Sequence, residues 1–326
     1  MKRRRFVALV GSALAAPLVT AQQPGKVYRI GFLTPDSAGR ARTDFRNASL
    51  EDGLRELGHV VGGNLFIEYR SAQGVADRLP ALAQELVGLN VDLIVTQTTV
   101  AAVSAKAVTA KIPIVMTVAS SVVERGLVAS LGRPGGNITG LIWDVEPEIN
   151  GKRLQLLKEA VPDASRIAIL WDMAIAPKPE GKKAVEDAGA ALRVQLLWPE
   201  ISDDLEGVFA TVVRERAHAV FVGGGLRLFG FRQKIVELAA KNRLPAIFEE
   251  LQNVEAGGLM SFAPDGRGHM KAAAKYVDRI LKGAKPADLP IERPTRLDLV
   301  INLKTAKALG LKLPQSLLLR ADRVIE

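Results

Sequence analysis

The sequence contains no cysteine, and this single absence excludes several kinds of chemistry at once. Without cysteine the chain can form neither disulfides nor thiolate metal sites, and it has no cysteine nucleophile. Histidine is scarce as well: His59, His218 and His269 lie in unrelated segments, and none pairs with a carboxylate at metal-ligand spacing. We therefore interpret the three histidines as solvated or incidental, and we expect no metal and no other cofactor.

Motifs of common enzyme classes are also missing. The sequence has no Gly-x-Ser-x-Gly elbow and no phosphate-binding loop that ends in Gly-Lys-Ser or Gly-Lys-Thr. The glycine-rich segments 132–137 and 223–225 lack the dinucleotide-binding spacing, and we interpret both as structural turns. The sequence thus favours a protein that is not an enzyme. An α/β enzyme acting on a small metabolite, such as a dehydrogenase, stays open as the alternative.

A long basic block is absent too. The formal net charge is +9, and Lys2, Arg3, Arg4 and Arg5 contribute +4, so residues 22–326 carry 9 − 4 = +5. That surplus is spread along the chain, which argues against nucleic acid as a partner.

The first 21 residues have the form of a secretory signal peptide. A basic start is followed by an apolar run over residues 6–19, which is shorter than the ~20 residues of a membrane-spanning helix. Val19-Thr-Ala21 provides the small residues of a cleavage site. The basic start also fits the twin-arginine pattern, and a simple membrane anchor is the alternative. We expect residues 1–21 to be removed and the mature protein to lie in the periplasm.

The rest of the chain alternates short apolar runs with amphipathic segments, which predicts parallel sheets covered by helices. We expect strands at residues 27–33, 65–69, 91–95, 112–118, 138–142, 166–171, 194–198, 219–222 and 246–248, and a return crossing between the lobes at 259–261. The fold class is therefore α/β, with two doubly wound parallel-sheet lobes joined by a hinge. We assign residues 27–143 and about 262–300 to the first lobe and 144–261 to the second, while the tail 301–326 is assigned to neither.

Small polar residues follow several of these strands. Ser120 and Ser121 come after the run at 112–118, residues 126–131 suggest one helical turn, and Trp143 ends the strand at 138–142. In open α/β sheets, ligands bind beyond the carboxyl ends of the strands. Trp143 could stack on a ligand there, or it could belong to the core.

One stretch carries a family resemblance. Gly126-Leu-Val-Ala-Ser-Leu-Gly-Arg-Pro-Gly-Gly-Asn-Ile-Thr-Gly140 closely resembles the signature of periplasmic substrate-binding proteins that serve ABC-type importers. The resemblance continues through residues 256–261, 280–290, 300–310 and 320–326, so it covers nearly the whole chain after residue 26. It implies the two-lobed, type I binding-protein fold, and the family includes members that bind aromatic amino acids.

The resemblance also implies where a ligand would bind, on loops after particular strands of both lobes. The candidate ligand-binding residues are Thr34, Asp36, Ser37, Gln97, Thr98, Thr99, Ser120, Ser121, Trp143, Asp172, Gly223 and Gly224. Two departures stand out. The family commonly has Gly-Thr where this chain has Thr98-Thr99, and Asp-Pro-Val where it has Ser121-Val-Val123. The second departure removes a partner for a ligand ammonium group.

These features together predict a monomeric periplasmic receptor that closes two lobes on a small ligand and delivers it to an ABC-type membrane permease. The hydroxyl groups that follow two neighbouring strands, and the helices expected to begin there, favour a ligand carboxylate on the first lobe. Asp172 or Asp144 would face a ligand cation from across the cleft. A sugar-repressor-like regulator shares this lobe architecture, but it would need a DNA-binding helix pair where the signal peptide stands.

Overall fold

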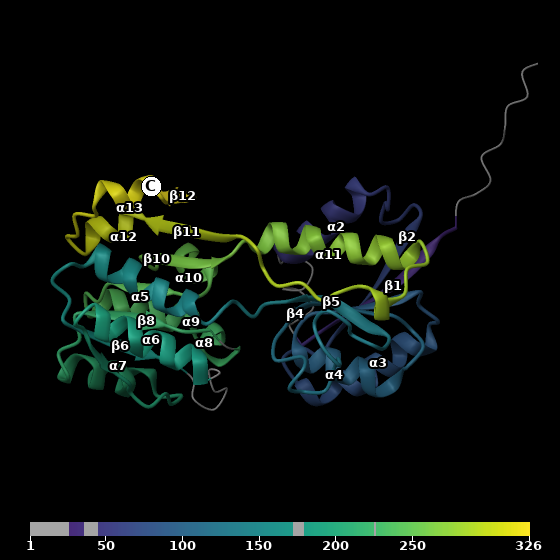
Figure 1. Cartoon of the computed structure of the whole chain (residues 1–326), viewed down its shortest axis with the longest axis horizontal. Coiled ribbons are helices and arrows are strands. Elements are labelled where there is room, and N and C mark those ends of the chain that lie inside the picture. Colours follow the sequence, from purple (N-terminus) through teal and green to yellow (C-terminus); the bar gives the residue numbers. More distant parts are fainter. Residues whose placement is uncertain (1–25, 36–44, 172–178, 225) are drawn as a thin grey trace, which may run out of the picture.

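The computed structural model describes residues 26–35, 45–171, 179–224 and 226–326. Two α/β lobes lie side by side, each built on its own sheet (Figure 1). This confirms the expected fold class.

The first lobe contains a five-stranded sheet in the order β2-β1-β3-β4-β5, and every neighbouring pair is parallel. Its strands are β1 (Tyr28–Thr34), β2 (Leu65–Ser71), β3 (Leu93–Thr96), β4 (Ile114–Ala119) and β5 (Ile138–Ile142). The covering helices are α2 (Phe45–Glu56), η1 (Ala76–Arg78), α3 (Leu79–Gly88), α4 (Thr99–Val108), α11 (Gly266–Leu281) and η3 (Pro286–Asp288). Strands buried on both faces explain why the sequence shows apolar runs here rather than strict alternation.

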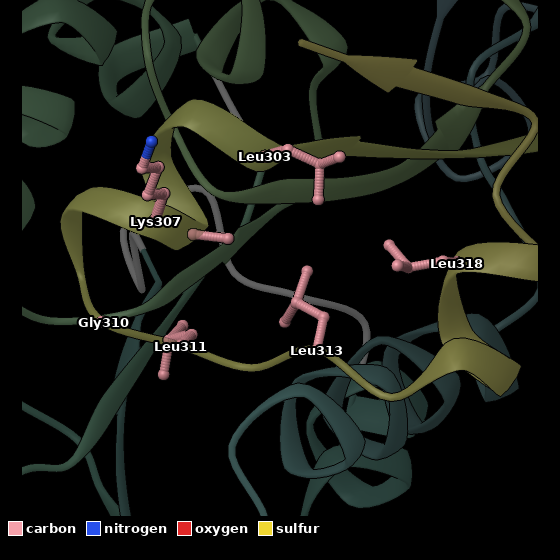
Figure 2. A pocket seen from close by; sticks show the side chains of 7 residues that line it. Leu303, Lys307, Gly310, Leu311, Leu313 and Leu318 are labelled. Carbon is pink, nitrogen blue, oxygen red and sulfur yellow. The ribbon is translucent and has the colours of Figure 1, made fainter.

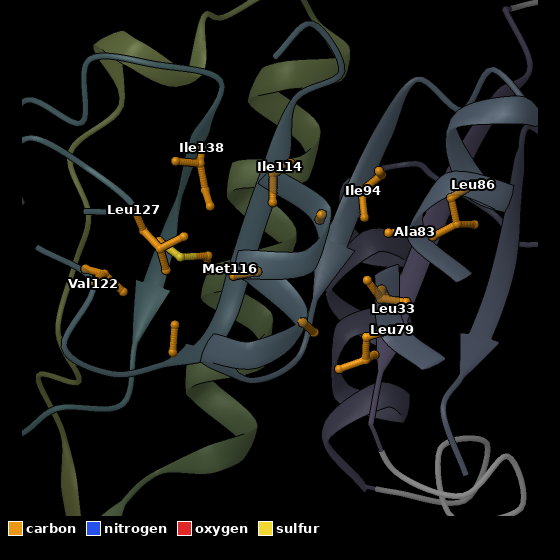
Figure 3. Close-up of a cluster of buried hydrophobic side chains, with 14 of the residues drawn as sticks. Leu33, Leu79, Ala83, Leu86, Ile94, Ile114, Met116, Val122, Leu127 and Ile138 are labelled. Atoms are coloured by element: carbon orange, nitrogen blue, oxygen red, sulfur yellow. The ribbon is translucent and has the colours of Figure 1, made fainter. Parts of the chain in front are cut away.

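Each face of the first sheet has its own apolar core. On one face, Leu79, Ala83 and Leu86 of α3 lie in one buried cluster with Ile94 and Met116 (Figure 3). Ala102 of α4 belongs to the same cluster. On the other face, α2 packs with α11, and Leu50, Leu54, Met270 and Ala273 are buried there. The 3.6-residue spacing of the apolar positions therefore corresponds to real packing faces.

The second lobe contains a seven-stranded sheet in the order β12-β11-β10-β9-β8-β6-β7. Its strands are β6 (Arg166–Leu170), β7 (Gln195–Leu197), β8 (Ala219–Val222), β9 (Ala246–Phe248), β10 (Met260–Pro264), β11 (Leu297–Asn302) and β12 (Arg323–Ile325). Its helices are α5 (Glu148–Ala160), α6 (Pro179–Ala191), α7 (Leu205–Arg214), α8 (Leu226–Gly230), α9 (Arg232–Lys241), α10 (Leu251–Glu255), α12 (Leu303–Ala308) and α13 (Gln315–Leu319). All pairs are parallel except β10–β11, where the chain re-enters the lobe in the opposite direction.

The chain passes between the lobes three times. It leaves the first sheet after β5, returns between β10 and α11, and leaves again between η3 and β11. The lobe boundaries expected near residues 262 and 300 differ in the structure, because residues 262–264 and 297–300 belong to the second sheet and not to the first lobe. The tail also joins the second sheet, since β12 pairs with β11.

The helical turn expected at residues 126–131 is wrong. Residues 121–127 form turns, and Ser121 and Gly126 both have positive φ, at 54° and 64°. A right-handed helix cannot include that conformation. These turns are instead held against α4, because the Lys106 ammonium of that helix donates to the carbonyls of Gly126 and Leu127.

Candidate functional site

The carboxyl ends of the first-lobe strands bring several predicted residues to one edge of the sheet. Thr34 ends β1, Gln97 and Thr98 follow β3, Ser120 and Ser121 follow β4, and Trp143 follows β5. Because the strands are parallel and adjacent, this edge gathers residues that are up to about a hundred positions apart. The structure therefore places these six predicted residues along a common edge.

Thr98 has an unusual backbone conformation for a residue with a side chain. Its φ is 89° and its ψ is 156°, a region that is essentially restricted to glycine. This is the position where the resembled family commonly has glycine. Thr98 precedes α4, and among the described residues no side-chain hydrogen bond caps the start of that helix. The first N–H groups of α4 therefore form a site that suits an anion.

The hydroxyl of Thr99 fixes the neighbouring loop. Its Oγ1 accepts from the Ser120 N–H at 2.9 Å and donates to the Ser120 carbonyl at 3.2 Å. In turn, the Asp144 carboxylate accepts from the Ser121 N–H at 2.9 Å. Thr99 and Asp144 thus shape the loop after β4, where no helix begins, so the helix-dipole argument applies to α4 alone.

Gln97 lies at the centre of this edge and is almost completely buried. Its Oε1 accepts from the Thr34 hydroxyl at 2.9 Å, while its Nε2 finds no hydrogen-bond partner in the described part of the chain. Trp143 Nε1, two strands away, is likewise buried and unpaired within the described residues. Buried unpaired N–H groups are costly, which makes them candidates for contact with a bound molecule.

His269 supports Trp143 from α11. The two rings meet edge to face with centroids 5.1 Å apart, and His269 Nε2 donates to the Thr117 carbonyl at 2.8 Å. Burial lowers the pKa of His269, and the hydrogen bond to Thr117 and the charges of Asp265 and Glu292 oppose that shift. A neutral imidazole therefore links α11, β4 and the end of β5. Sequence reasoning regarded this histidine as incidental, and the element that buries it is far away in the chain.

The second sheet also has candidate residues at the carboxyl ends of its strands. Gly223 and Gly224 follow β8, and a Cβ at Gly223 would lie 3.1 Å from the Trp171 ring. The Gly224 N–H donates to the Glu249 carboxylate, which follows β9. Arg153, a fully buried residue of α5, lies with Nη1 3.3 Å from Glu249 Oε1 and donates from Nε to the Phe262 carbonyl at 2.7 Å.

Neither Arg153 nor Glu249 is among the site residues predicted from the sequence. Glu249 directly follows a predicted strand, and this position could have identified it, because Gly223 was predicted from the same kind of position after another strand. Arg153 carried no such signal, since a charged residue in an amphipathic helix is usually solvated. Asp36, Ser37 and Asp172 lie outside the described residues.

Across the described ranges, no group of three or more histidine, aspartate or glutamate side chains could hold a metal ion. No described helix is both long and apolar enough to cross a membrane. A hollow of about 420 Å³ lies in the second lobe, beside α12 and α13 (Figure 2). It includes none of the predicted site residues, and Lys307 is its single charged lining residue, so we regard it as a surface hollow.

Comparison with known proteins gives a consistent result. A curated tyrosine-binding protein of Clostridioides difficile (strain R20291) is 25% identical over 261 residues, which is 79% of this chain and 74% of that protein. A solved ABC domain in complex with L-Trp from Streptococcus pneumonia is 26% identical, with a TM-score of 0.78 over 91% of this chain and 99% of its own. A conserved domain protein from Vibrio cholerae has the same identity and TM-score, over 92% and 100%.

The family comparison covers most of the chain. The family described as ABC transporter substrate binding protein matches residues 40–325, which include the second sheet, strands β2 to β5 of the first sheet and all three passages between the lobes. Together with the two-lobed fold and the facing strand ends, this match shows that the chain belongs to the ABC transporter substrate binding protein family.

Proposed function

We propose that this chain binds a small carboxylate-bearing ligand, an amino acid or an aromatic or other organic acid, between its two lobes. The observation that carries the proposal is the uncapped start of α4, which Thr98 alone separates from Gln97, whose buried Nε2 has no partner in the described chain. A carboxylate at this point would accept from the helix N–H groups and from the amide. The relatives that bind tyrosine and tryptophan support a ligand of this size.

We further propose that the protein is a receptor without catalytic activity, acting as a monomer in the periplasm and delivering its ligand to an ABC-type permease. The family match supports the transport role. The signal-peptide form of residues 1–21 supports export, and intact mass of protein from a periplasmic extract should begin at Gln22. A full-length species confined to the cytoplasm would contradict export.

Gln97→Glu tests the carboxylate site. The substituted side chain can keep an acceptor for the Thr34 hydroxyl, but it replaces the free N–H donor with a negative oxygen. Losing a charge-assisted contact and adding repulsion should weaken binding by about two decades. The measurement is calorimetry with a ligand identified by native purification and mass spectrometry.

The matched control is Ser130→Ala, because the Ser130 hydroxyl bonds only within its own turn, to Arg133. This variant should bind like the parent protein. Equal affinity in both variants would contradict the first-lobe carboxylate site, and steady turnover of the ligand would favour an enzyme.

A further inference from the structure

The carboxyl end of β3 carries a run of polar groups that the protein leaves unsatisfied. Thr96 Oγ1, Gln97 Nε2 and Thr98 Oγ1 are buried, and none of the three has a hydrogen-bond partner within the described ranges. β3 is the central strand of the first sheet, with an apolar core on each face. Buried polar atoms without a partner are costly, so three in succession mark a place where a bound molecule supplies contacts.

The Thr98 hydroxyl differs from two other hydroxyls at this edge, because it holds no part of the fold in place. The Thr34 hydroxyl donates to Gln97 Oε1, and the Thr99 hydroxyl is bonded to both backbone groups of Ser120. The Thr98 hydroxyl makes no such contact in the part of the chain that the structure describes. It is therefore a donor that stays available to a ligand.

The backbone of Thr98 supports the same conclusion. Its φ of 89° and ψ of 156° lie in a region that glycine adopts without strain and threonine does not. The side chain at this position therefore costs the fold stability. Strain of this kind is characteristic of positions that bind ligands or substrates.

Thr98 also adjoins the part of the first lobe that suits an anion. Its carbonyl accepts from the Ala102 N–H at 3.2 Å, so its backbone takes part in the first turn of α4. Among the described residues, no side chain caps that turn. A hydrogen bond from a hydroxyl to a charged oxygen is roughly twice as strong as one to a neutral oxygen. A carboxylate bound at the start of α4 is thus the acceptor that this hydroxyl suits best.

We infer that Thr98 is a specificity-determining residue, whose hydroxyl donates to the ligand carboxylate and makes the site prefer a carboxylate over the corresponding carboxamide. This inference rests on the proposed carboxylate-binding function and adds the residue that reads the charge of the group. The strained backbone is the stability that the fold loses by placing a side chain there.

The test uses Thr98→Val and Thr98→Ser in the mature protein, residues 22–326. Valine keeps the branched shape and lacks the hydroxyl, whereas serine keeps the hydroxyl. The probes are acid and amide pairs: L-tyrosine with L-tyrosinamide, L-tryptophan with L-tryptophanamide, benzoate with benzamide, and 4-methylpentanoate with 4-methylpentanamide.

For each acid that binds the parent protein, calorimetry should show at least about tenfold weaker binding to Thr98→Val. Thr98→Ser should bind the same acid within about threefold of the parent. Binding of the matching amide should weaken by no more than about threefold in Thr98→Val. A structural role would weaken acid and amide equally and would overturn the inference. Where the amide binds neither protein, the contrast between valine and serine decides.

Thr211→Val is the matched control, because the Thr211 hydroxyl lies on α7 of the second lobe and accepts only from Arg214 Nη2 among its printed sequence neighbours on that helix. This variant should bind every acid like the parent protein. Thr98→Val binding like the parent would overturn the inference. If Gln97→Glu still weakens binding, the carboxylate-binding function stands without it.

Thr98→Gly separates the ligand contact from the fold by the direction of two effects. Without ligand, its urea unfolding midpoint should equal or exceed that of the parent, because the strain is relieved. Its affinity for the same acid should nevertheless fall at least about tenfold. A loss of both stability and affinity would assign Thr98 a structural role and overturn the inference.

If none of the acids binds the parent protein, the inference is also overturned. The proposed function is then judged separately, by the ligand recovered from natively purified protein.

Discussion

Thr98 holds a conformation that costs free energy wherever a side chain is present. Its φ of 89° and ψ of 156° place it in a region that typically costs about 1–3 kcal/mol for a residue other than glycine. The residue also separates the unpaired Gln97 amide from the first turn of α4. Strain is therefore located directly at the proposed carboxylate site.

Replacing Thr98 with glycine should stabilise the fold relative to Thr98→Ala by about 1–2 kcal/mol, because only glycine adopts this conformation without strain. Urea unfolding of the two variants gives the comparison. Both variants lack the Thr98 hydroxyl, so the difference between their unfolding free energies reports the backbone strain at this position. Equal stability of the two variants would show that the position is not strained in solution.

His269 should make the stability of the protein depend on pH. Burial lowers the pKa of the folded His269 below the ordinary value of 6.5, so the unfolded chain takes up the proton first as the pH falls. The folded state therefore loses stability below about pH 6.5, by up to ~1.4 kcal/mol per pH unit, until the folded pKa is reached.

In His269→Gln, which can still donate to the Thr117 carbonyl, this contribution should disappear. The difference in unfolding free energy between pH 8 and pH 5.5 should then be about 1 kcal/mol smaller than in the parent. An unchanged pH profile would assign the dependence to other groups.

At the scale of elements, the contact between α2 and α11 anchors the returning chain on the first lobe. Gly53 lies at the centre of this contact, and a Cβ there would be 2.9 Å from Ala274 Cβ and 3.1 Å from Lys271 Cα. The two helices approach so closely because glycine leaves room at the crossing. Lys271 also pairs with Glu56 across the exposed side, a contact that contributes little by itself.

Gly53→Ala should destabilise the protein by about 1–3 kcal/mol, since overpacking the crossing outweighs the gain in helix propensity. Gly88→Ala is the matched control, because Gly88 ends α3 and a Cβ added there would meet no atom within 4 Å. That variant should be neutral or up to about 1 kcal/mol more stable. Thermal unfolding of both proteins measures the contrast, and a stabilised Gly53→Ala would contradict the close crossing.

At the scale of the whole molecule, three passages join the lobes, and they are connected to one another. Arg293 pairs with Glu146 at 3.0 Å, and the Asp265 N–H donates to the Arg296 carbonyl at 3.1 Å. Residue 292 also runs beside β5, since the Ile142 N–H donates to its carbonyl. Short connected segments of this kind suit a hinge, in which a few residues absorb the motion of two rigid lobes.

A ligand that contacts both lobes should shift the hinge toward a closed form, in proportion to its differential affinity for that form. We expect the radius of gyration measured by solution scattering to decrease at saturating ligand. Gln97→Glu, at the same ligand concentration, is the control and should scatter like the unliganded protein. An unchanged radius in the parent protein would argue against closure.

The sequence by itself determined the elements and their class. β-branched apolar runs such as residues 138–142 and 219–222 became strands with the predicted bounds, because burial on both faces needs continuous apolar residues. Leu50 and Leu54, which are four residues apart in the sequence, are both buried against the sheet, since helical periodicity directly encodes a packing face. The polar residues after β3 and β4 lie at one edge of the first sheet, because neighbouring parallel strands end on the same side.

Only the tertiary structure decided which distant residues meet. Arg153 is paired with Glu249 and the Phe262 carbonyl, and His269 with Thr117 and Trp143, through contacts that no local pattern encodes. The third passage and the place of β11 and β12 in the second sheet also depend on strand pairing. Local periodicity reports the face that a residue buries, but the partner on that face is chosen by packing of the whole chain.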